Sequence, residues 1–467
     1  MPPVLAVCVW MILATGLLVR DPAKEGKASI ALWIPIVWMI IIGSRLPSQW
    51  LNVQSSSMAQ AMEEGNLTDA SIYVLLMLLA FGVLVSRSFR WDRFCKNNWP
   101  LIAFLGFALL STCWSDFPII ALKRWIRDLG TYLAILVVLT ESNSAEAIRL
   151  TLRRFLYLLV PLSVVIIKYL PTLGIQYNQW TGAPEYMGVT TSKNMLGVLC
   201  LVSGIFFFWD STTRWSLRRQ KRTKRILAVN AVMIVMTVWL LHMCGSSTSQ
   251  LCMVLGWMII LAVRSKAARR RPAFLMVMIP LCVCLYLILA FGFGFDINAL
   301  VAEAIGKDPT LTGRTVIWNA VMSTKTNPVL GTGYETFWLG PRLLRVWQLT
   351  GPGINEAHNG YLEVYLNLGV VGVILLLIFL MGSYRAICRR LEADFSIGSL
   401  GMAFWAILPF YNVTESAFRG QLVFVTFLFV ALVVPEKVKA RNTYVQKETL
   451  HREREAEQNA AALYEVI

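Results

Sequence analysis

Residues 361–378 read YLEVYLNLGVVGVILLLI, a run that is long and apolar enough to cross a membrane as one helix. A bilayer core of about 30 Å needs roughly 20 apolar residues in helical form. Comparable runs lie near residues 4–19, 28–43, 70–86, 99–113, 129–141, 155–170, 194–209, 226–243, 250–263, 273–294, 359–382, 396–411 and 420–434. The chain is therefore predicted to be an all-α polytopic membrane protein with about 12–13 transmembrane helices.

Composition supports this fold class and limits the number of domains. The 467 residues are 57% hydrophobic and 15% charged, and the longest hydrophilic stretch is about residues 295–358. This leaves no room for a separate soluble domain. We expect one membrane domain over residues 1–434, with a large periplasmic loop at about 295–358, and a charged cytoplasmic tail at 435–467. Most of the nine cysteines lie in apolar runs without metal-ligand spacing, so core packing is their expected role.

The net charge of +16 is distributed in a way that indicates membrane topology rather than nucleic-acid binding. Lysine and arginine concentrate in connections between predicted spans, at residues 87–96, 214–225 and 264–271. Such clusters are typical of cytoplasmic loops. The outward loops are then 44–69, 114–128, 171–193, 244–249 and 295–358, with a short turn at 412–419, and the polar motifs of the chain fall in them.

An outward-facing site restricts the chemistry that the protein can perform. The sequence holds no Walker-type or dinucleotide-binding glycine loop, and nucleotides are not expected outside the membrane. A transferase placed there must use an activated donor that has already crossed the membrane, which for sugars means a polyprenyl-phosphate-linked donor. Such a reaction needs cations for the phosphates and a base for the acceptor hydroxyl.

His358 is the strongest candidate for the base. It lies beside Glu356 and Asn359 at the start of the 361–378 run, and the chain has only three histidines. An imidazole there could accept a proton from the acceptor, with Glu356 or Glu363 orienting it. The alternative is an interfacial helix cap. His242, at the end of an apolar run, and His451, in the charged tail, are weaker candidates.

Arg314 is the first candidate ligand for a diphosphate. It follows Thr312 and Gly313 and opens the segment TVIWNAVMSTK, which is predicted to be an amphipathic helix with apolar positions at 316, 317, 320 and 321. An arginine at a helix start combines its fixed charge with free backbone N–H groups. The alternative is a salt bridge at the membrane surface. The following residues 327–334, NPVLGTGY, predict a sharp turn with close backbone approach.

Further cationic and polar candidates lie in other outward segments. Arg124 and Arg127 share one helical face, and either bind phosphate or pair with Asp116 and Asp128. The remaining substrate-binding candidates are Lys193 and Asn194, which open a predicted span, Asn359, and Arg419, for which Glu415 is a predicted i,i+4 salt-bridge partner.

The motifs occur in the order WSDFP–KRW, GVTTSKNMLG, GSSTSQ, LTGRTVIW–NPVLGTGY, AHNGYLEVYLNLGVVG and NVTESA. In this order, across residues 45–434, the chain resembles the O-antigen ligase and polymerase superfamily. It looks most like exopolysaccharide polymerases of the succinoglycan type. Ligases of the superfamily commonly carry an arginine after a serine in the segment that here reads GSSTSQ, and this chain has none there. That departure weakens a ligase assignment, or moves phosphate binding to Arg124, Arg127 or Lys193.

The resemblance implies a membrane-embedded glycosyltransferase of the GT-C type in the bacterial inner membrane, with its active site facing the periplasm. The implied donor is an undecaprenyl-diphosphate-linked glycan, the acceptor is a glycan or lipid, and no metal or other cofactor is expected. Transfer would be inverting, with Arg314 and Arg124 holding the diphosphate and His358 assisting the acceptor.

Two alternative functions remain open at this stage. A ligase that joins finished glycan to lipid A core or another acceptor would have nearly the same fold and residues. A transporter of lipid-linked sugar or of small anions would also have many spans. Against transport, the sequence shows no internal repeat, and charged residues are rare inside the predicted spans, Lys168 being the exception.

Overall fold

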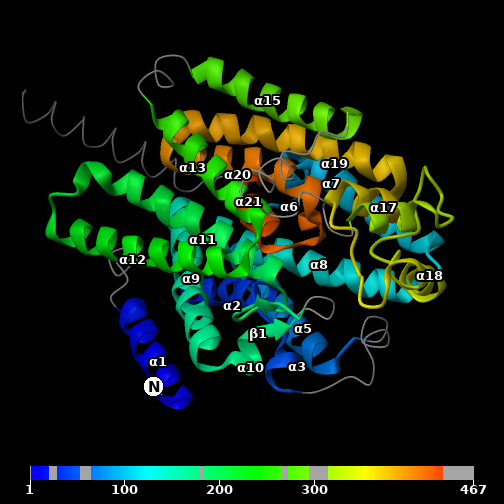
Figure 1. The fold of residues 1–467 in the computed structure, drawn as a ribbon. Helices are drawn as coiled ribbons and strands as arrows, with labels where there is room; N and C mark the ends of the chain where they lie inside the picture. The colour runs from blue at the N-terminus through cyan, green and yellow to red at the C-terminus, as the bar shows by residue number, and fades with distance from the viewer. Residues whose placement is uncertain are drawn as a thin grey trace, which may run out of the picture.

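The computed structural model describes residues 2–19, 29–52, 65–177, 182–265, 272–293 and 314–434. Their fold is almost entirely helical (Figure 1). The helices are α1 Pro3–Val19, α2 Trp33–Ile42, α3 Pro47–Trp50, α5 Leu67–Ser86, α6 Trp91–Asn97, α7 Trp99–Leu110, α8 Pro118–Leu139, α9 Ser144–Tyr169, α10 Pro171–Gly174, α11 Lys193–Arg214, α12 Lys221–Cys244, α13 Ser247–Arg264, α15 Pro272–Phe293, α17 Arg314–Met322, α18 Gly340–Thr350, α19 Gly360–Ala393, α20 Phe395–Thr414 and α21 Leu422–Ala431. Strands β1 Ile175–Tyr177 and β2 Pro184–Tyr186 form a short antiparallel hairpin.

The predicted fold class is confirmed. Each of the predicted apolar runs coincides with a helix, and within the described residues seven helices are long and apolar enough to cross a membrane. Five shorter apolar helices accompany them, among them α1 and α21. The tail at 435–467 and the first part of the predicted periplasmic loop, together with His451, Thr312 and Gly313, lie outside the described residues.

Helix α20 forms the centre of the bundle. In the apolar 18-residue stretch of α20, 94% of the residues are buried. In the corresponding stretch of α5 only 22% are buried, so α5 lies at the surface of the bundle along most of its length. Helices α11, α13, α19 and α21 pack around α20. In Figure 1, α17 and α18 lie at one end of the bundle, opposite the connection between α11 and α12. Because α20 ends at Thr414, it carries Glu415 toward the end that holds α17 and α18.

Helix α19 is interrupted at Gly369, where φ is 64° and ψ is −166°. The turn predicted at residues 327–334 docks against this break. The carbonyl of Leu366 accepts the N–H of Thr332 at 3.1 Å, and Val370 donates to the carbonyl of Pro328 at 2.9 Å. A side chain on Gly369 would lie 2.2 Å from the carbonyl oxygen of Val329. The turn therefore satisfies the backbone groups that the break exposes, and glycine is required there.

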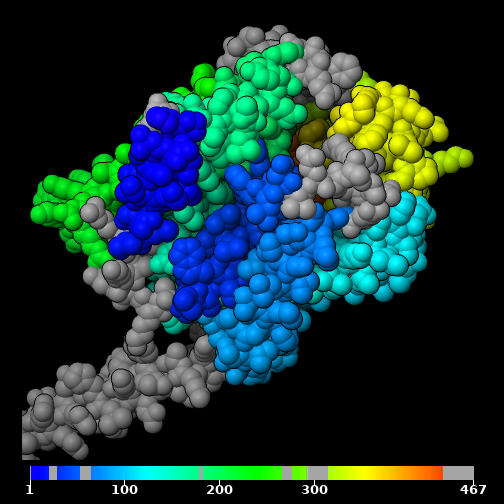
Figure 2. Space-filling model, turned by 90° about the horizontal axis from the view of Figure 1, so that it is seen from below, coloured from blue at the N-terminus to red at the C-terminus, as the bar shows by residue number. Residues whose placement is uncertain are grey.

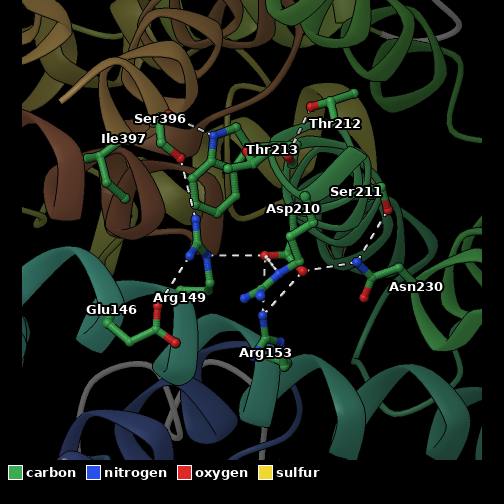
Figure 3. Close-up of polar contacts among 12 residues, drawn as sticks. Glu146, Arg149, Arg153, Asp210, Ser211, Thr212, Thr213, Asn230, Ser396 and Ile397 are labelled. Carbon is green, nitrogen blue, oxygen red and sulfur yellow. Dashed lines mark hydrogen bonds and ion pairs between the residues drawn. The ribbon is translucent and has the colours of Figure 1, made fainter. Parts of the chain in front are cut away.

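A buried ion cluster holds the other end of the bundle together (Figure 3). Asp210 of α11 is fully buried and pairs with Arg149 at 3.1 Å and Arg153 at 3.2 Å, both from α9, and with Arg214 at 3.0 Å. Asn230 of α12 donates to the same carboxylate at 2.9 Å. Three helices are thereby fixed to one another by a carboxylate whose loss would leave buried cations without compensation.

The space-filling view in Figure 2 shows the periphery of the molecule. Helix α1 lies on the surface of the face shown, and its Trp10 donates to the carbonyl of Leu158 at 3.2 Å. The segment that holds α17 and α18 forms a raised mass beside the first part of α8. Contacts between Ser115 and Thr336, at 2.9 Å, tie these two regions together.

Candidate active site

The segment that carries His358 is held by its neighbours on both sides. Asn359 caps α19, because its side-chain oxygen accepts the N–H groups of Tyr361 at 3.1 Å and Leu362 at 3.0 Å. On the other side, the buried Glu363 carboxylate accepts the N–H of Ala357 at 2.5 Å. His358 itself has φ of +49°, an uncommon value for a residue other than glycine. Such backbone strain, sustained by surrounding contacts, is typical of functional sites.

His358 lies between two carboxylates. Its Nδ1 is 3.1 Å from Glu356 and 3.6 Å from Glu415. Burial alone lowers the pKa of His358, but the charge and hydrogen bonding of Glu356 and Glu415 outweigh it and raise the pKa to about 10. For Glu356, burial raises the pKa, and the nearby His358, Arg419 and Arg314 lower it below its ordinary value. The two nearby carboxylates therefore favour the protonated form of the His358 imidazole.

Glu415 joins three segments of the chain. Arg314, at the start of α17, donates to its Oε1 at 2.7 Å, and Asn194, at the start of α11, donates to its Oε2 at 3.3 Å. Its backbone carbonyl accepts the N–H of Gly360 at 2.9 Å. The structure thus brings four of the predicted site residues, Arg314, Glu356, His358 and Asn194, close to one buried carboxylate. Their roles stay predictions, and Glu415 was not expected at their centre.

A second part of the site centres on Glu335. Its side chain pairs with Arg419 at 2.9 Å, and its backbone carbonyl accepts a hydrogen bond from Arg124. Arg419 also donates to the carbonyl of Asn355 at 3.1 Å, directly before Glu356. Glu335 has φ of +55° and follows the glycine-rich turn that docks on α19. Arg124 of α8 and Arg419 of the α20–α21 connection therefore meet at Glu335, and Arg419 also contacts the segment that carries His358.

Two predicted ligands pair with carboxylates other than Glu335, Glu356 and Glu415. Lys193 pairs with Glu185 of β2 at 2.9 Å, and Arg127 pairs with Asp128 at 3.1 Å. The pairing of Arg127 with Asp128 is one of the two alternatives that the sequence left open. Asp116 pairs with Arg342 of α18 rather than with the 123–128 segment.

The predicted salt bridge between Glu415 and Arg419 is wrong. Helix α20 ends at Thr414, and Glu415 itself is extended, with φ of −144° and ψ of 165°. Without helical backbone between them, four residues of separation do not place the two side chains on one face. Glu415 pairs with Arg314 instead, and Arg419 pairs with Glu335.

Sequence reasoning missed the roles of Glu415 and Glu335. Both are acidic residues in segments predicted to face outward, and acidic residues are scarce in this chain. Glu335 directly follows the motif NPVLGTGY, and Glu415 belongs to the motif NVTESA. The scarcity of acidic residues in these segments could have marked Glu335 and Glu415 as candidates for the site. The amphipathic segment 314–322 is confirmed as α17, with Ile317, Ala320 and Val321 buried, whereas Val316 is 52% exposed.

The carboxylates and the imidazole could also hold a cation. Ligand atoms of Glu356, His358 and Glu415 lie within 4.8 Å of one another, and one histidine with two carboxylates is a set that divalent metals accept. In the structure the same carboxylates contact Arg314 and His358. The expected independence from metal thus remains a prediction.

Comparisons with known proteins agree with the motifs. Residues 231–377 match the family described as O-antigen ligase, and this stretch contains Arg314, Glu356 and His358. Over 319 residues the chain is 24% identical to the exopolysaccharide production protein ExoQ of Rhizobium meliloti (strain 1021), which covers 67% of this chain and 70% of that protein. Both comparisons confirm the resemblance that the motifs predicted, and the chain is similar to the O-antigen ligase family and to an exopolysaccharide production protein.

Proposed function

We propose that the protein is a membrane-embedded glycosyltransferase that polymerises undecaprenyl-diphosphate-linked oligosaccharide repeats into an exopolysaccharide or O-antigen-type polymer. The observation that carries this proposal is the convergence of Arg314, Glu356, His358 and Glu415 at one end of a bundle of membrane helices. Two cations and two carboxylates at that position suit the transfer of a sugar from a lipid diphosphate. The similarity to ExoQ favours polymer synthesis.

The site would face the periplasm from the inner membrane. The basic clusters near residues 87–96 and 214–225 lie at the ends of the membrane helices and in the segments that join them, which the positive-inside rule assigns to the cytoplasm. In Figure 1 the α11–α12 connection is at the end opposite α17 and α18. A donor that has crossed the membrane on its lipid carrier would reach the site from the bilayer.

Arg314 would bind the donor diphosphate, with Arg124 and Arg419 as further cations. Arg314 is the first residue of α17, so a phosphate beside it would also meet N–H groups of the first helical turn. Its side chain is 17% exposed, which leaves the guanidinium reachable while Glu415 holds it in one orientation. Guanidinium groups supply positive charge in a fixed planar geometry, so this scheme needs no metal.

The reaction would be an inverting displacement. The acceptor hydroxyl oxygen forms a bond to the anomeric carbon of the donor, and the bond from that carbon to the diphosphate oxygen breaks, with its electron pair leaving on the diphosphate. The hydroxyl proton passes to the pair formed by His358 and Glu356. Since the carboxylates favour the protonated form of His358, Glu356 would be the group of this pair that accepts the proton, while the imidazole keeps Glu356 oriented and adds positive charge to the site.

A ligase and a transporter are the two alternatives to this proposal. A ligase would use the same donor and residues but a different acceptor, and the match to the O-antigen ligase family supports that class of chemistry equally. A transporter of lipid-linked sugars or anions would need a path across the bundle. In the central helix α20, 94% of the residues in the apolar 18-residue stretch are buried, and the polar cluster lies at one end of the bundle. This arrangement favours catalysis over transport.

The test is the surface polysaccharide of a strain that lacks the protein, resupplied with wild type, His358→Ala or His242→Ala. His242 is exposed on α12 and serves as the matched control. Single repeats left on the lipid carrier, rescued by wild type and His242→Ala but not by His358→Ala at equal membrane levels, would support polymerisation. Long chains remaining on the carrier would identify a ligase, and unchanged polysaccharide would overturn the glycan function.

A further inference from the structure

A cavity of about 460 Å³ opens between the ends of α7, α19 and α21. It lies in the second part of α19, beyond the break at Gly369, whereas His358 lies before the start of this helix. Its lining combines three cationic side chains, Lys96, Arg385 and Arg389, with Trp99 and the apolar Leu101 and Phe379. The cavity is thus separate from the candidate active site and has a different chemistry.

The cavity has fixed walls. Gly382 faces Pro100 so closely that an added side-chain carbon would lie 3.1 Å from it, and the small residue at this position keeps the space open. Asn98 connects the start of α7 to the end of α21, because it donates to the carbonyl of Val433 at 2.8 Å and accepts the N–H of Val433 at 3.0 Å. The depression is therefore a feature of helix packing rather than of a surface loop.

The three cations have no carboxylate partner within the part of the chain that the structure describes. Two other arginines do have partners in the structure. Arg390 donates to the carbonyl of Val430 at 3.1 Å, and Arg90 pairs with Asp92 at 3.2 Å. Arg385 and Arg389 are four residues apart on one face of α19, and both are exposed. Their charges are available to an anionic ligand.

We propose that this cavity binds an anionic glycerophospholipid. Basic pockets between transmembrane helices at the membrane surface recognise lipid phosphates. Lys96, Arg385 and Arg389 would hold the phosphate, Trp99, which is 58% exposed, would lie at headgroup level, and an acyl chain would run along Leu101 and Phe379. The sources of phosphate that compete with this ligand are inorganic phosphate and polyprenyl phosphate.

Native mass spectrometry of the full-length purified protein tests the proposal. The protein would be offered phosphatidylglycerol, phosphatidylethanolamine, a polyprenyl phosphate or inorganic phosphate, each alone and then in competition. The variants are Arg385→Gln/Arg389→Gln and, as a matched control, Arg219→Gln/Lys221→Gln, which removes two exposed cations at the start of α12 and just before it. Circular dichroism would show that each variant is folded.

The expected result is retention of phosphatidylglycerol over phosphatidylethanolamine, weakened roughly tenfold or more in the Arg385/Arg389 variant and unchanged in the control. Equal weakening in both variants, or no preference for the anionic lipid, would overturn the proposal. Displacement by millimolar inorganic phosphate, or preferential binding of polyprenyl phosphate, would overturn it too. A photoreactive residue at position 386 gives a further test, because Ala386 lines the cavity and the chain continues from Val433 beside it. A crosslink from this position to residues 435–467, and not to lipid, would also overturn the proposal.

Discussion

Glu415 accepts a hydrogen bond from Arg314 at 2.7 Å, across 101 positions of the sequence. The carboxylate is 3% exposed and directly follows α20, the most buried of the seven long apolar helices in the described residues, so its position is set by the core of the bundle. Arg314, by contrast, begins α17 in the segment that follows the undescribed residues 294–313. The buried core therefore fixes the position of Glu415, and Glu415 in turn fixes the orientation of Arg314, the cation that would bind the donor diphosphate.

Replacing Glu415 by glutamine should lower polymerisation by about 100-fold, the size of loss typical when one preorganised electrostatic group is removed. The variant keeps the shape of the side chain but removes the charge that holds both Arg314 and His358. Polymer length in complemented cells, normalised to membrane protein level, would measure this. Glu146→Gln is the control, because Glu146 pairs with Arg149 at the other end of the bundle. Wild-type polymer in Glu415→Gln would contradict the assigned role.

The pH dependence of stability should report the charge on His358. Its pKa is raised from 6.5 to about 10 in the folded protein, so its imidazolium stabilises the fold fully below about pH 6.5 and loses this contribution as the pH rises through about 10. The thermal midpoint of wild type should fall between pH 7 and 10 more steeply than that of His358→Gln, in which this group no longer titrates. Parallel curves for the two proteins would show that Glu356 and Glu415 do not hold a charged imidazole.

The membrane helices were predictable from sequence because hydropathy is a local property. Each run from 4–19 to 420–434 coincides with a helix, since a backbone in a bilayer must satisfy its own hydrogen bonds. The break in α19 was not predicted, because a glycine within a largely apolar run does not by itself indicate a break in a helix. Only the docking of residues 328–333, which supplies the missing partners, makes that conformation stable.

The site was predictable in its residue types but not in its pairing. Arg314 and His358 were identified from their positions at helix starts, which is local information. Their shared partner Glu415 comes from a distant segment, and the local rule of i,i+4 spacing assigned it to Arg419. That rule holds only inside a helix, and α20 ends one residue earlier. Contacts between segments depend on packing of the whole bundle, which spacing along the chain does not encode.

Chelation should leave activity unchanged if guanidinium groups supply the positive charge. Purified protein with a lipid-linked repeat would be assayed for polymer formation before and after treatment with EDTA. We expect equal rates, because Arg314 and His358 already contact the carboxylates that could otherwise hold a cation. A loss of activity that added Mg²⁺ or Mn²⁺ restores would instead assign Glu356, His358 and Glu415 to a metal site and contradict the metal-free proposal.

Replacing Gly369 by alanine should destabilise the protein by about 2–5 kcal/mol, combining backbone strain with overpacking. The conformation at Gly369 is one that residues with side chains rarely adopt, and the new carbon would overlap the carbonyl of Val329. Because the same turn leads into Glu335, which holds Arg419, activity should fall with stability. Gly106→Ala in α7, where nothing lies within 4 Å of the added carbon, is the control and should be neutral or slightly stabilising. Equal thermal midpoints and equal polymer yields for the two variants would show that the turn does not depend on the break in α19, and that the position of Glu335 is set by other contacts.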